Sequence, residues 1–464
     1  MVVLKKLLCL VSVTCLLATT LVGCTPNNKE LYDAYVKTSN VTSANTDMSL
    51  TIKADTSNVK DANIKMALSL LDGVKIDINA KSIKDTKGII KVAMNGQIVA
   101  LKVPYKFGVW VDSDLTDAKN PKFFEIIKYP SDIPNFPKLF SSRYMYMDLV
   151  NAQKAENMPQ IDFDGYKSLM DTNKLLDSLK NIDTTNIKVD KKVVGSNKEF
   201  TLSLDNATAK SLTSQYFDAI FNGPILKSLY SGNTLDQSKQ TFDMISKVFG
   251  EINLFGEKGI KSVITVDSNG YFSEEKDTID MSIDVEQIAK AIGKVTEADM
   301  SNVPKEKFGI TIEAVTKYSD LNKITSIDLP KLTNSNSIDM NALSKLSKYG
   351  APNVLLNGKV VEFEDVSPKL VNDRTMVPMR KIFESLGATV DYSDGVITAI
   401  KGDKAIKHTI GENVIYVNDT PIEMDVASLE TDGRTLVPVR FISNALGAKV
   451  DWENELQTVV ITEE

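Results

Sequence analysis

The sequence predicts an α+β protein in which a large domain, a curved antiparallel sheet with packed helices, is followed by a small duplicated α+β module. Between residues 30 and 330, short segments alternate apolar and polar residues, and Asn-Gly or Asp-Gly pairs lie between several of them. This pattern is typical of antiparallel strands with one apolar face. Beyond Pro352 the chain repeats itself at an offset of 60 residues, as from Arg374 to Arg434, which indicates two copies of one unit.

The composition excludes several classes of function. The chain has 464 residues, enough for two or three domains, of which 42% are hydrophobic and 25% charged, as in folded proteins. A net charge of −7 lacks the basic surface that nucleic acid requires, so we expect no nucleic-acid partner. His408 is the one histidine, and all three cysteines lie within the first 24 residues. A site with several histidines is therefore excluded, and we expect no metal and no cofactor.

The N-terminal residues predict an export signal. Lys5 and Lys6 precede an apolar run over residues 7–17, the length of a signal-peptide core and shorter than the about 20 residues of a membrane span. The segment ends in Leu21-Val22-Gly23-Cys24, which resembles the lipobox of bacterial lipoproteins. An ordinary cleaved signal followed by a chance cysteine is the alternative.

The lipobox resemblance implies that residues 1–23 are a removed signal peptide and that the Cys24 thiol carries diacylglycerol. Residues 24–29 would then be the lipidated cysteine and a polar tether. Acyl chains would anchor the protein to the cell membrane on its extracytoplasmic face. Loss of Lys5 and Lys6 would change the net charge from −7 to −9 (−7 − 2), and no thiol would remain free.

Residues 30–330 predict one domain of strands and helices. Strands are expected at 48–52, 64–70, 74–78, 90–94, 98–103, 107–111, 186–194, 198–204, 260–266, 279–283 and 310–315. Hairpin turns are expected at Asp72-Gly73, Asn95-Gly96, Gly195-Ser196 and Asn269-Gly270. Helices are expected at 30–37, 164–181, 206–221 and 225–249.

The order of these elements resembles the bacterial lipoprotein-carrier superfamily, in which a curved antiparallel sheet wraps around helices. Some of its members hold a lipid or another apolar ligand between sheet and helices, so the resemblance implies such a cavity. The alternative is a core filled by the protein's own side chains. Aromatic residues between the prolines of residues 121–137 and beyond could form a lid or a packed connection; the residues of this connection are Phe123, Phe124, Ile126, Ile127, Tyr144 and Tyr146.

Residues 331–352 predict a linker with a short helix around 340–348, and residues 353–464 predict the duplicated module. Arg-Thr-Met-Val-Pro-Met-Arg at 374–380 corresponds to Arg-Thr-Leu-Val-Pro-Val-Arg at 434–440, and a Leu-Gly-Ala-x-Val motif follows in each copy. The proline can start a helix, an apolar stripe at helical spacing follows, and the glycine can end it. Each copy is therefore expected to fold as strand, loop, short helix and strand.

Arginine is concentrated in these repeated motifs. The chain has 54 basic residues, of which five are arginines, and four of those are Arg374, Arg380, Arg434 and Arg440. A planar guanidinium can hold a carboxylate in a fixed geometry that lysine cannot provide. The arginines could tie each copy together, or they could form a paired cationic groove for an anionic envelope polymer. The candidate acceptors are Glu362, Glu364, Asp391, Glu423, Asp425 and Asp451.

Residues 353–462, which carry both pairs of motifs, resemble the copper amine oxidase N-terminal-like domain. This domain recurs as a stalk or surface module in exported proteins of Gram-positive bacteria and is not the catalytic part of the oxidase. The resemblance therefore implies a non-catalytic module without a copper site. His408 lies in a strand pattern between Ile406 and Ile410, which indicates a packed side chain rather than a metal ligand.

Three functions remain open. The first is a non-catalytic, lipid-anchored surface protein whose module folds alone as residues 353–464 and binds a cell-wall polymer or an envelope protein. The second is a carrier or sensor of an apolar ligand held between the inner sheet face and the helices of 206–249. The third is a hydrolase of envelope polymers with paired buried carboxylates in a cleft. We favour the first, because neither a nucleophile elbow nor a phosphate loop occurs, and expect no enzyme activity.

Overall fold

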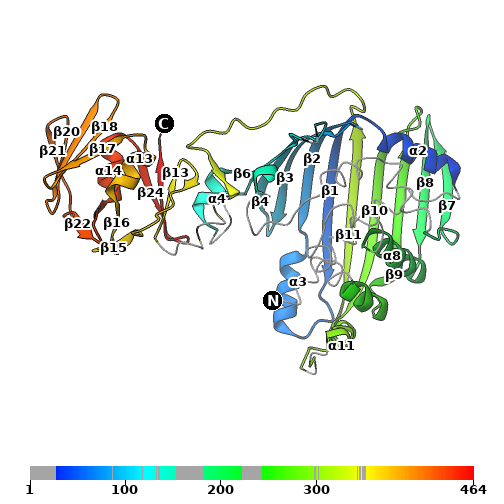
Figure 1. Ribbon diagram of the computed structural model, residues 1–464. Coiled ribbons are helices and arrows are strands. Elements are labelled where there is room, and N and C mark those ends of the chain that lie inside the picture. The colour runs from blue at the N-terminus through cyan, green and yellow to red at the C-terminus, as the bar shows by residue number, and fades with distance from the viewer. Residues whose placement is uncertain are drawn as a thin grey trace. The chain divides into compact units, whose positions relative to one another are not determined.

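The computed structural model describes residues 28–85, 87–117, 119–131, 133, 136–152, 182–221, 243–296, 299–300, 302–341, 343, 346 and 352–463. The chain has the mixed α+β fold that the sequence predicts (Figure 1). Its contacts divide it into two compact units. The first unit comprises Met1–Phe124 and Leu149–Leu329, and the second comprises Glu125–Asp148 and Pro330–Glu464.

The largest sheet has 12 strands in the order β12-β6-β5-β4-β3-β2-β1-β11-β10-β9-β8-β7. Its described registers are antiparallel, except for the parallel pairing of β12 with β6. The strands of the first unit are β1 (Ser43–Asp55), β2 (Lys75–Lys84), β3 (Ile89–Ala100), β4 (Val103–Asp114), β7 (Lys188–Val194), β8 (Asn197–Leu204), β9 (Phe255–Val266), β10 (Phe272–Asp284) and β11 (Lys307–Ser319). The predicted large antiparallel sheet is therefore confirmed.

Helices pack on one face of this sheet, and Figure 1 shows α8 lying over β9. The core between them contains Leu212 of α8 and Phe249 together with strand residues such as Ile279. Because side chains alternate along a strand, β10 buries Ile279, Met281 and Ile283 in one phase. The helices of this unit are α2 (Lys29–Ser39), α3 (Ala62–Leu71), α5 (Leu149–Ala152), α8 (Asn206–Phe221) and α11 (Val285–Thr296), and residues 243–251 are also helical.

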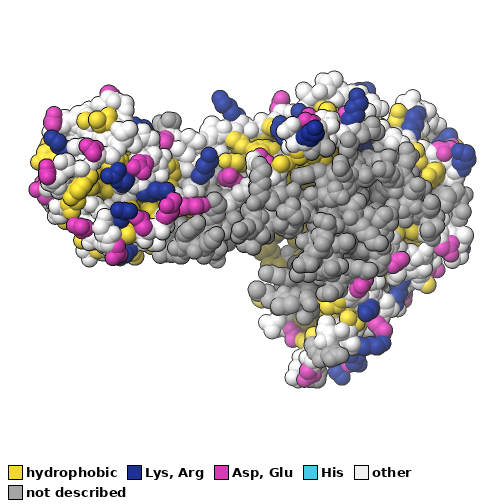
Figure 2. Space-filling model, in the orientation of Figure 1, with side chains coloured by type: hydrophobic (Ala, Val, Ile, Leu, Met, Phe, Trp, Pro, Cys, Tyr) yellow, Lys and Arg dark blue, Asp and Glu magenta, His cyan; other side chains and the backbone are white. Residues whose placement is uncertain are grey.

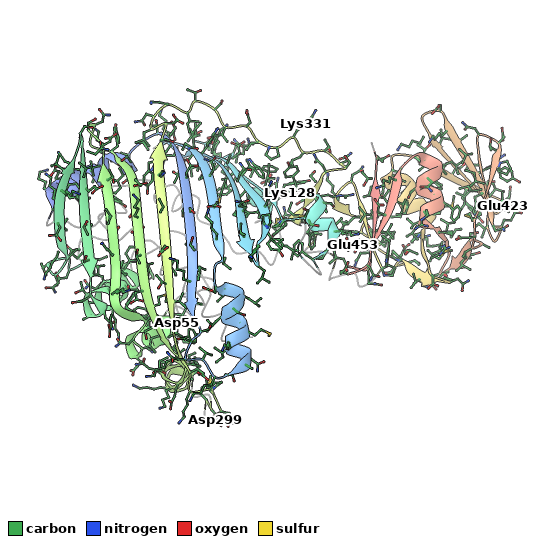
Figure 3. The ribbon with its side chains drawn as sticks, turned by 180° about the vertical axis from the view of Figure 1, so that it is seen from behind. Asp55, Lys128, Asp299, Lys331, Glu423 and Glu453 are labelled. Carbon is green, nitrogen blue, oxygen red and sulfur yellow. The ribbon has the colours of Figure 1, made fainter. Side chains whose placement is uncertain are left out.

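The strand predicted at 64–70 is wrong, because these residues form helix α3. The Asp61 carboxylate accepts hydrogen bonds from the backbone N–H groups of Asn63 and Ile64, which caps the first turn. Leu68 is buried, whereas Met66 points to solvent. Figure 3 shows Asp55, at the end of β1, near the same helix. Ile64 and Leu68 are four residues apart and share the buried face of the helix, whereas Leu70, like Met66, lies on the exposed side. The aspartate cap was the sequence signal that favours a helix over a strand.

The hairpin turn predicted at Asn95-Gly96 is also wrong, since both residues lie within β3. The chain turns instead at Leu101 and Lys102, whose φ angles are 49° and 66°. Gly96 pairs with Phe107 on β4, and a Cβ atom at Gly96 would lie 2.5 Å from the ring Cζ of that phenylalanine. The glycine therefore makes room for an aromatic ring rather than for a turn.

The other predicted elements of the first unit divide into three groups. The helices expected at 30–37 and 206–221 are confirmed as α2 and α8, and the turns at Gly195-Ser196 and Asn269-Gly270 join β7 to β8 and β9 to β10. Asp72-Gly73 connects α3 to β2 rather than two strands. The helix expected at 164–181 and most of that expected at 225–249 lie outside the described residues.

The second unit contains three smaller sheets, with the strand orders β14-β13-β25-β24, β15-β16-β23-β22 and β17-β18-β19-β20-β21. Its helices in the repeats are α13 (Met379–Ser385) and α14 (Val439–Leu446). Its strands there are β13 (Asn353–Leu356), β14 (Lys359–Val360), β15 (Lys369–Val371), β16 (Arg374–Pro378), β17 (Thr389–Ser393), β18 (Val396–Lys401), β19 (Lys404–Thr409), β20 (Val414–Val417), β21 (Thr420–Glu423), β22 (Leu429–Thr431), β23 (Arg434–Pro438), β24 (Lys449–Glu453) and β25 (Thr458–Thr462).

The helices of the repeats begin and end where the motifs predict. Pro378 and Pro438 are the N-caps of α13 and α14, and Gly447 ends α14 with a left-handed φ of 88°. Gly387 has the equivalent φ of 81° after α13. Apolar residues of both helices, such as Phe383, lie in one shared core. The predicted order of strand, short helix and strand is therefore confirmed in each copy.

The two copies exchange their hairpins. The first copy comprises β13–β18, and the second comprises β20–β25, in which each strand lies about 60 residues later. The β13-β14 hairpin of the first copy pairs with β24-β25 of the second, and β20-β21 of the second completes the sheet of β17-β18 through β19. Neither copy therefore builds its own sheet alone.

A local twofold axis relates the copies. In the central sheet β16 pairs with β23 in an antiparallel register, with Met376 opposite Pro438 and Pro378 opposite Leu436. Because these residues correspond after a shift of 60, the axis passes between Val377 and Val437, both of which are buried. The duplication in the sequence thus becomes a symmetric, interlocked fold.

The second unit also contains an earlier part of the chain, which the sequence assigned to the 30–330 domain. This part comprises most of β5 (Lys122–Lys128), then α4 (Lys138–Ser142) and β6 (Tyr144–Asp148), and it is joined by β12 (Ser337–Asp339) of the expected linker. Leu139 and Met145 pack against Leu355 of β13 and Val460 of β25. Glu453 lies beside α4 in Figure 3, and its carboxylate accepts a 2.8 Å hydrogen bond from the Leu139 N–H.

The predicted aromatic connection is therefore partly a packed element of the second unit. Phe140 and Ile127 contribute to the same cluster as Leu139. In the linker, the described residues at 340, 341, 343 and 346 are helical, as expected, and the rest of 340–348 lies outside the described residues. Within the part of the chain that the structure describes, no helix combines the length and apolar character needed to cross a membrane.

Candidate functional site

Of the predicted site residues, the four repeated arginines lie in the described part of the chain, and Cys24 lies outside it. The lipid attachment at Cys24 therefore stays a prediction. The fifth arginine, Arg143, also belongs to the second unit, and its Nη2 lies 3.2 Å from Thr462 Oγ1 on β25. All five arginines thus lie in one unit.

Arg374 and Arg434 join the two copies. Arg374 Nε donates to Asp425 Oδ2 at 2.5 Å, and Arg434 Nε donates to Asp365 Oδ2 at 2.6 Å. The two pairs are equivalent under the 60-residue repeat, and each crosses from one copy to the other. Asp425 is one of the predicted acceptors, and Asp365 is not. Because all four side chains are exposed to solvent, each pair adds little to the free energy of unfolding.

Arg380 and Arg440 occupy equivalent positions but have different surroundings. Arg380 Nη1 donates to the Val390 carbonyl oxygen at 3.1 Å and lies 3.6 Å from Glu384 Oε1, one turn along α13. The residue equivalent to Glu384 in the second copy is Asn444. No hydrogen bond or ion pair joins the Arg440 guanidinium to another residue that the structure describes. Arg440 is therefore the repeated arginine that remains available to a partner.

A groove of about 350 Å³ lies beside Arg440. Arg374, Arg440 and Trp452 line it together with the carboxylates Asp373 and Asp451. Figure 2 shows basic side chains among hydrophobic and acidic ones on the visible face of the second unit. The groove considered from the sequence was a paired cationic one, and the groove in the structure contains two arginines together with two aspartates.

His408 is a structural residue of the second unit. Its side chain is 1% exposed on β19, between Ile397 of β18 and Ile415 of β20. Nδ1 lies 2.8 Å from the Val414 carbonyl oxygen, so that nitrogen carries the proton, and Nε2 lies 2.8 Å from Ser428 Oγ. Burial lowers the pKa of His408, which keeps the imidazole neutral.

The inner face of the large sheet holds a second polar cluster, which we did not predict from the sequence. Glu275 and Asp277 of β10 are 1% and 4% exposed, and Tyr318 on β11 donates to Glu275 Oε2 at 3.3 Å. Glu275 Oε1, both Asp277 carboxylate oxygens and the hydroxyl of Ser262 on β9 are buried without a hydrogen-bond partner. Burial raises the pKa of Asp277 to about 6, and burial and the neighbouring Asp277 charge raise that of Glu275.

A sequence signal for this cluster existed. Glu275 and Asp277 are in the same alternating phase as Ile279, Met281 and Ile283, which form the core face of β10. Two carboxylates in the apolar phase of a strand are rare and mark a place that needs an explanation. Composition alone hides them, because the chain has 61 acidic residues.

The open pockets of the first unit lie elsewhere. Two of about 580 and 550 Å³ share the lining residues Asn206 and Asn253, and neither is lined by Glu275 or Asp277. A third pocket of about 550 Å³ is lined by residues of β1, β2, β3, β4 and β11, such as Asp77 and Lys317, and it likewise does not include the two buried carboxylates. Among the described residues, no group of three or more His, Cys, Asp or Glu side chains could hold a metal ion.

The interlocked repeat with its arginine motifs agrees with a known family. Residues 355–461 match the family model of the copper amine oxidase N-terminal domain. This part of the chain is therefore similar to copper amine oxidase N-terminal domains. The match covers about a quarter of the chain, and a copper amine oxidase N-terminal domain is typically a non-catalytic module. Comparisons with curated proteins and with solved structures give no match, so the resemblance of residues 30–330 to lipoprotein carriers stays a prediction.

Proposed function

We propose that this is a non-catalytic, lipid-anchored protein on the extracytoplasmic face of the cell membrane, whose C-terminal module (residues 353–464) binds a cell-wall polymer. The non-catalytic part of this proposal is supported by the match of residues 355–461 to the copper amine oxidase N-terminal domain, which is typically a non-catalytic module. Within it, Arg374 and Arg434 hold the copies together and His408 is bonded internally. Arg440 and its groove supply polar groups that a polymer can contact.

The lipid anchor is inferred from the resemblance of the sequence at Cys24 to a lipobox. We expect the full chain, expressed in a Gram-positive host fed an alkyne-labelled fatty acid, to acquire the label and to fractionate with membranes. The Cys24→Ala variant should lose the label and appear in the medium. A variant that keeps the label, or that stays with the membrane, would contradict lipid attachment at this residue.

The binding role is tested with the mature chain, residues 25–464, and purified cell walls. We expect the protein to sediment with walls from which all proteins have been removed by detergent and protease. Binding should weaken as the ionic strength rises, because part of it is electrostatic. Binding to untreated walls alone would indicate an envelope protein as the partner and would contradict a polymer.

A second candidate function is the carrier or sensor of an apolar ligand. The observation that favours it is the pair of buried carboxylates of Glu275 and Asp277, for which the hydroxyl groups of Ser262 and Tyr318 are the neighbouring donors in an otherwise apolar sheet face. An apolar ligand with an ammonium or hydroxyl group would supply further donors. Native mass spectrometry of residues 25–464, followed by solvent extraction, tests it: a lipid of defined mass supports the carrier, and a ligand-free mass counts against it.

A further inference from the structure

We propose that the groove beside Arg440 binds a sugar that carries a carboxylate. The inference rests on the proposed function, because it names the part of a cell-wall polymer that the C-terminal module recognises. It is drawn from a difference between two halves of a symmetric fold, in which one half satisfies its arginine internally and the other does not.

Part of the difference comes from one position on the helices. In the first copy, Glu384 lies one turn after Arg380 and forms an ion pair with it, while the Val390 carbonyl oxygen accepts a second contact. In the second copy, Asn444 replaces the carboxylate. Arg440 therefore keeps its guanidinium donors, which are always charged and arranged to match a carboxylate in a two-point contact.

The groove supplies a platform next to this cation. Trp452 is 39% exposed and lines the same groove as Arg440. An indole ring offers a flat apolar face, on which the C–H face of a sugar ring can lie, as well as a polar N–H edge. The amide side chains of Asn454 and Gln457 also line the groove and can exchange hydrogen bonds with hydroxyl or acetamido groups.

The charges of the groove favour a sugar with an isolated negative charge over a polyanion. Arg374 is already paired with Asp425, whereas the lining also contains the carboxylates of Asp373 and Asp451, the second of which is paired with Lys449. The chain as a whole carries −7. A dense phosphodiester polymer would be repelled, but a sugar can direct one carboxylate to Arg440 and donate its hydroxyl groups to the aspartates.

A matched pair of ligands measures how much the carboxylate contributes to binding. We suggest titrating the mature chain with a disaccharide of glucuronic acid and N-acetylglucosamine, and with N-acetylchitobiose, which lacks the uronic acid carboxylate. The Trp110→Phe background leaves Trp452 as the one tryptophan, so its fluorescence reports binding at the groove. We expect the acidic disaccharide to bind about tenfold more tightly, the usual effect of one charge-assisted hydrogen bond.

Two substitutions and one control test whether the carboxylate binds Arg440. Asn444→Glu gives Arg440 the internal partner that Arg380 has, and Arg440→Gln removes the charge; each should weaken the acidic disaccharide about tenfold and leave N-acetylchitobiose unchanged. The control Arg380→Gln alters the equivalent position of the other copy and should leave both affinities unchanged. Thermal unfolding curves show whether each variant is folded.

The outcomes separate this inference from the proposed function. Equal affinity of the two disaccharides, or unchanged binding in Asn444→Glu and Arg440→Gln, overturns the groove assignment even if the protein still binds cell walls. Binding of the acidic disaccharide without binding to walls supports the groove and counts against the proposed function. Arg440-dependent binding of a glycerol-phosphate polymer in preference to the disaccharide overturns the choice of a carboxylate.

Discussion

Glu275 and Asp277 must either ionise within an apolar sheet face or keep a proton there. A pKa that burial has raised means that the folded state holds a proton where the unfolded state has released it. The free energy of unfolding therefore falls as the pH rises from about 4 through the folded-state value of about 6 for Asp277. Above that pH both states are ionised, and the cost of the buried charge is fully present.

We predict that Asp277→Asn stabilises the first unit at pH 7.5. A shift of the Asp277 pKa from 3.8 to about 6 corresponds to about 3 kcal/mol, which the neutral amide would recover in part. Urea denaturation of the Trp452→Phe chain, in which Trp110 reports on the first unit, measures this. The gain should shrink toward pH 4; a gain that is the same at both pH values would contradict the account.

His408 has the opposite effect on the pH dependence of the second unit. Its pKa is lowered by burial, so the stability that the neutral imidazole provides is present above the unfolded value of 6.5 and is lost as the pH falls below it. We predict that the free energy of unfolding, measured by urea denaturation at Trp452 in the Trp110→Phe background, falls between pH 7.5 and 5.5, by at most about 1.4 kcal/mol per pH unit.

The control for this prediction is His408→Asn, which can still donate to the Val414 carbonyl oxygen but does not titrate in this range. The variant should be less stable than the parent at pH 7.5 and nearly independent of pH down to 5.5. An equal pH dependence in parent and variant would show that another group is responsible.

At the scale of single elements, the β3-β4 hairpin uses residues that do not suit its turn. Leu101 and Lys102 both have positive φ, a conformation that costs an L-residue with a side chain about 1 kcal/mol or more, and Leu101 is 67% exposed. We predict that Leu101→Asn with Lys102→Gly stabilises the first unit by about 1 kcal/mol, because Asn-Gly suits a two-residue turn. Urea denaturation followed at Trp110 measures the gain.

The matched control is Leu101→Ala with Lys102→Ala. It removes the exposed apolar side chain without easing positive φ, so we expect no gain. If the alanine pair stabilises the protein as much as Asn-Gly, the effect comes from the surface side chain and not from the turn. The same positive φ pair occurs with favourable residues at Asn357-Gly358 of the second unit.

The exchanged hairpins predict that neither copy of the repeat is stable alone. A chain that ends at residue 402 keeps β13 but lacks β25, the strand that pairs in parallel with Val354 and Leu356 of β13. We predict that residues 353–401 then lose their protection from hydrogen exchange. Addition of residues 403–464 as a separate fragment should restore it, whereas protection without the fragment would show that the first copy folds independently.

At the scale of the whole chain, the unit that contains the module begins earlier than the sequence suggests. Leu355 and Val460 are buried against Leu139 and Met145, which come from residues 125–148. Isolated residues 353–464 would expose this apolar face. We predict that they unfold at a lower urea concentration than in the mature chain and that they self-associate, which size-exclusion chromatography measures.

Leu355→Thr with Val460→Thr supplies the control for self-association. The substitutions make the exposed face of the isolated module more polar. The module should therefore become more monomeric without becoming more stable. A wild-type module that is monomeric and has the same urea midpoint as the mature chain would show that residues 125–148 are dispensable. The sequence expectation that residues 353–464 fold alone is tested by the same experiment.

The sequence by itself determined the local features of this protein. Strand alternation, the Pro and Gly positions of α13 and α14, and the 60-residue repeat are properties of neighbouring residues, and all appear in the fold. Predictions from short segments were wrong where the local pattern is ambiguous, as in α3, or where a glycine makes room for a neighbouring side chain, as at Gly96.

Only the tertiary structure decided the features that join distant residues. It paired Arg374 with Asp425, exchanged the hairpins of the copies, and placed residues 125–148 with the C-terminal module. It also distinguished Arg440 from Arg380, although their motifs are alike, and brought Ser262 and Tyr318 beside the carboxylates of β10. The physical reason is that burial, ion pairing and groove formation depend on which elements meet in space, and local propensity does not specify those partners.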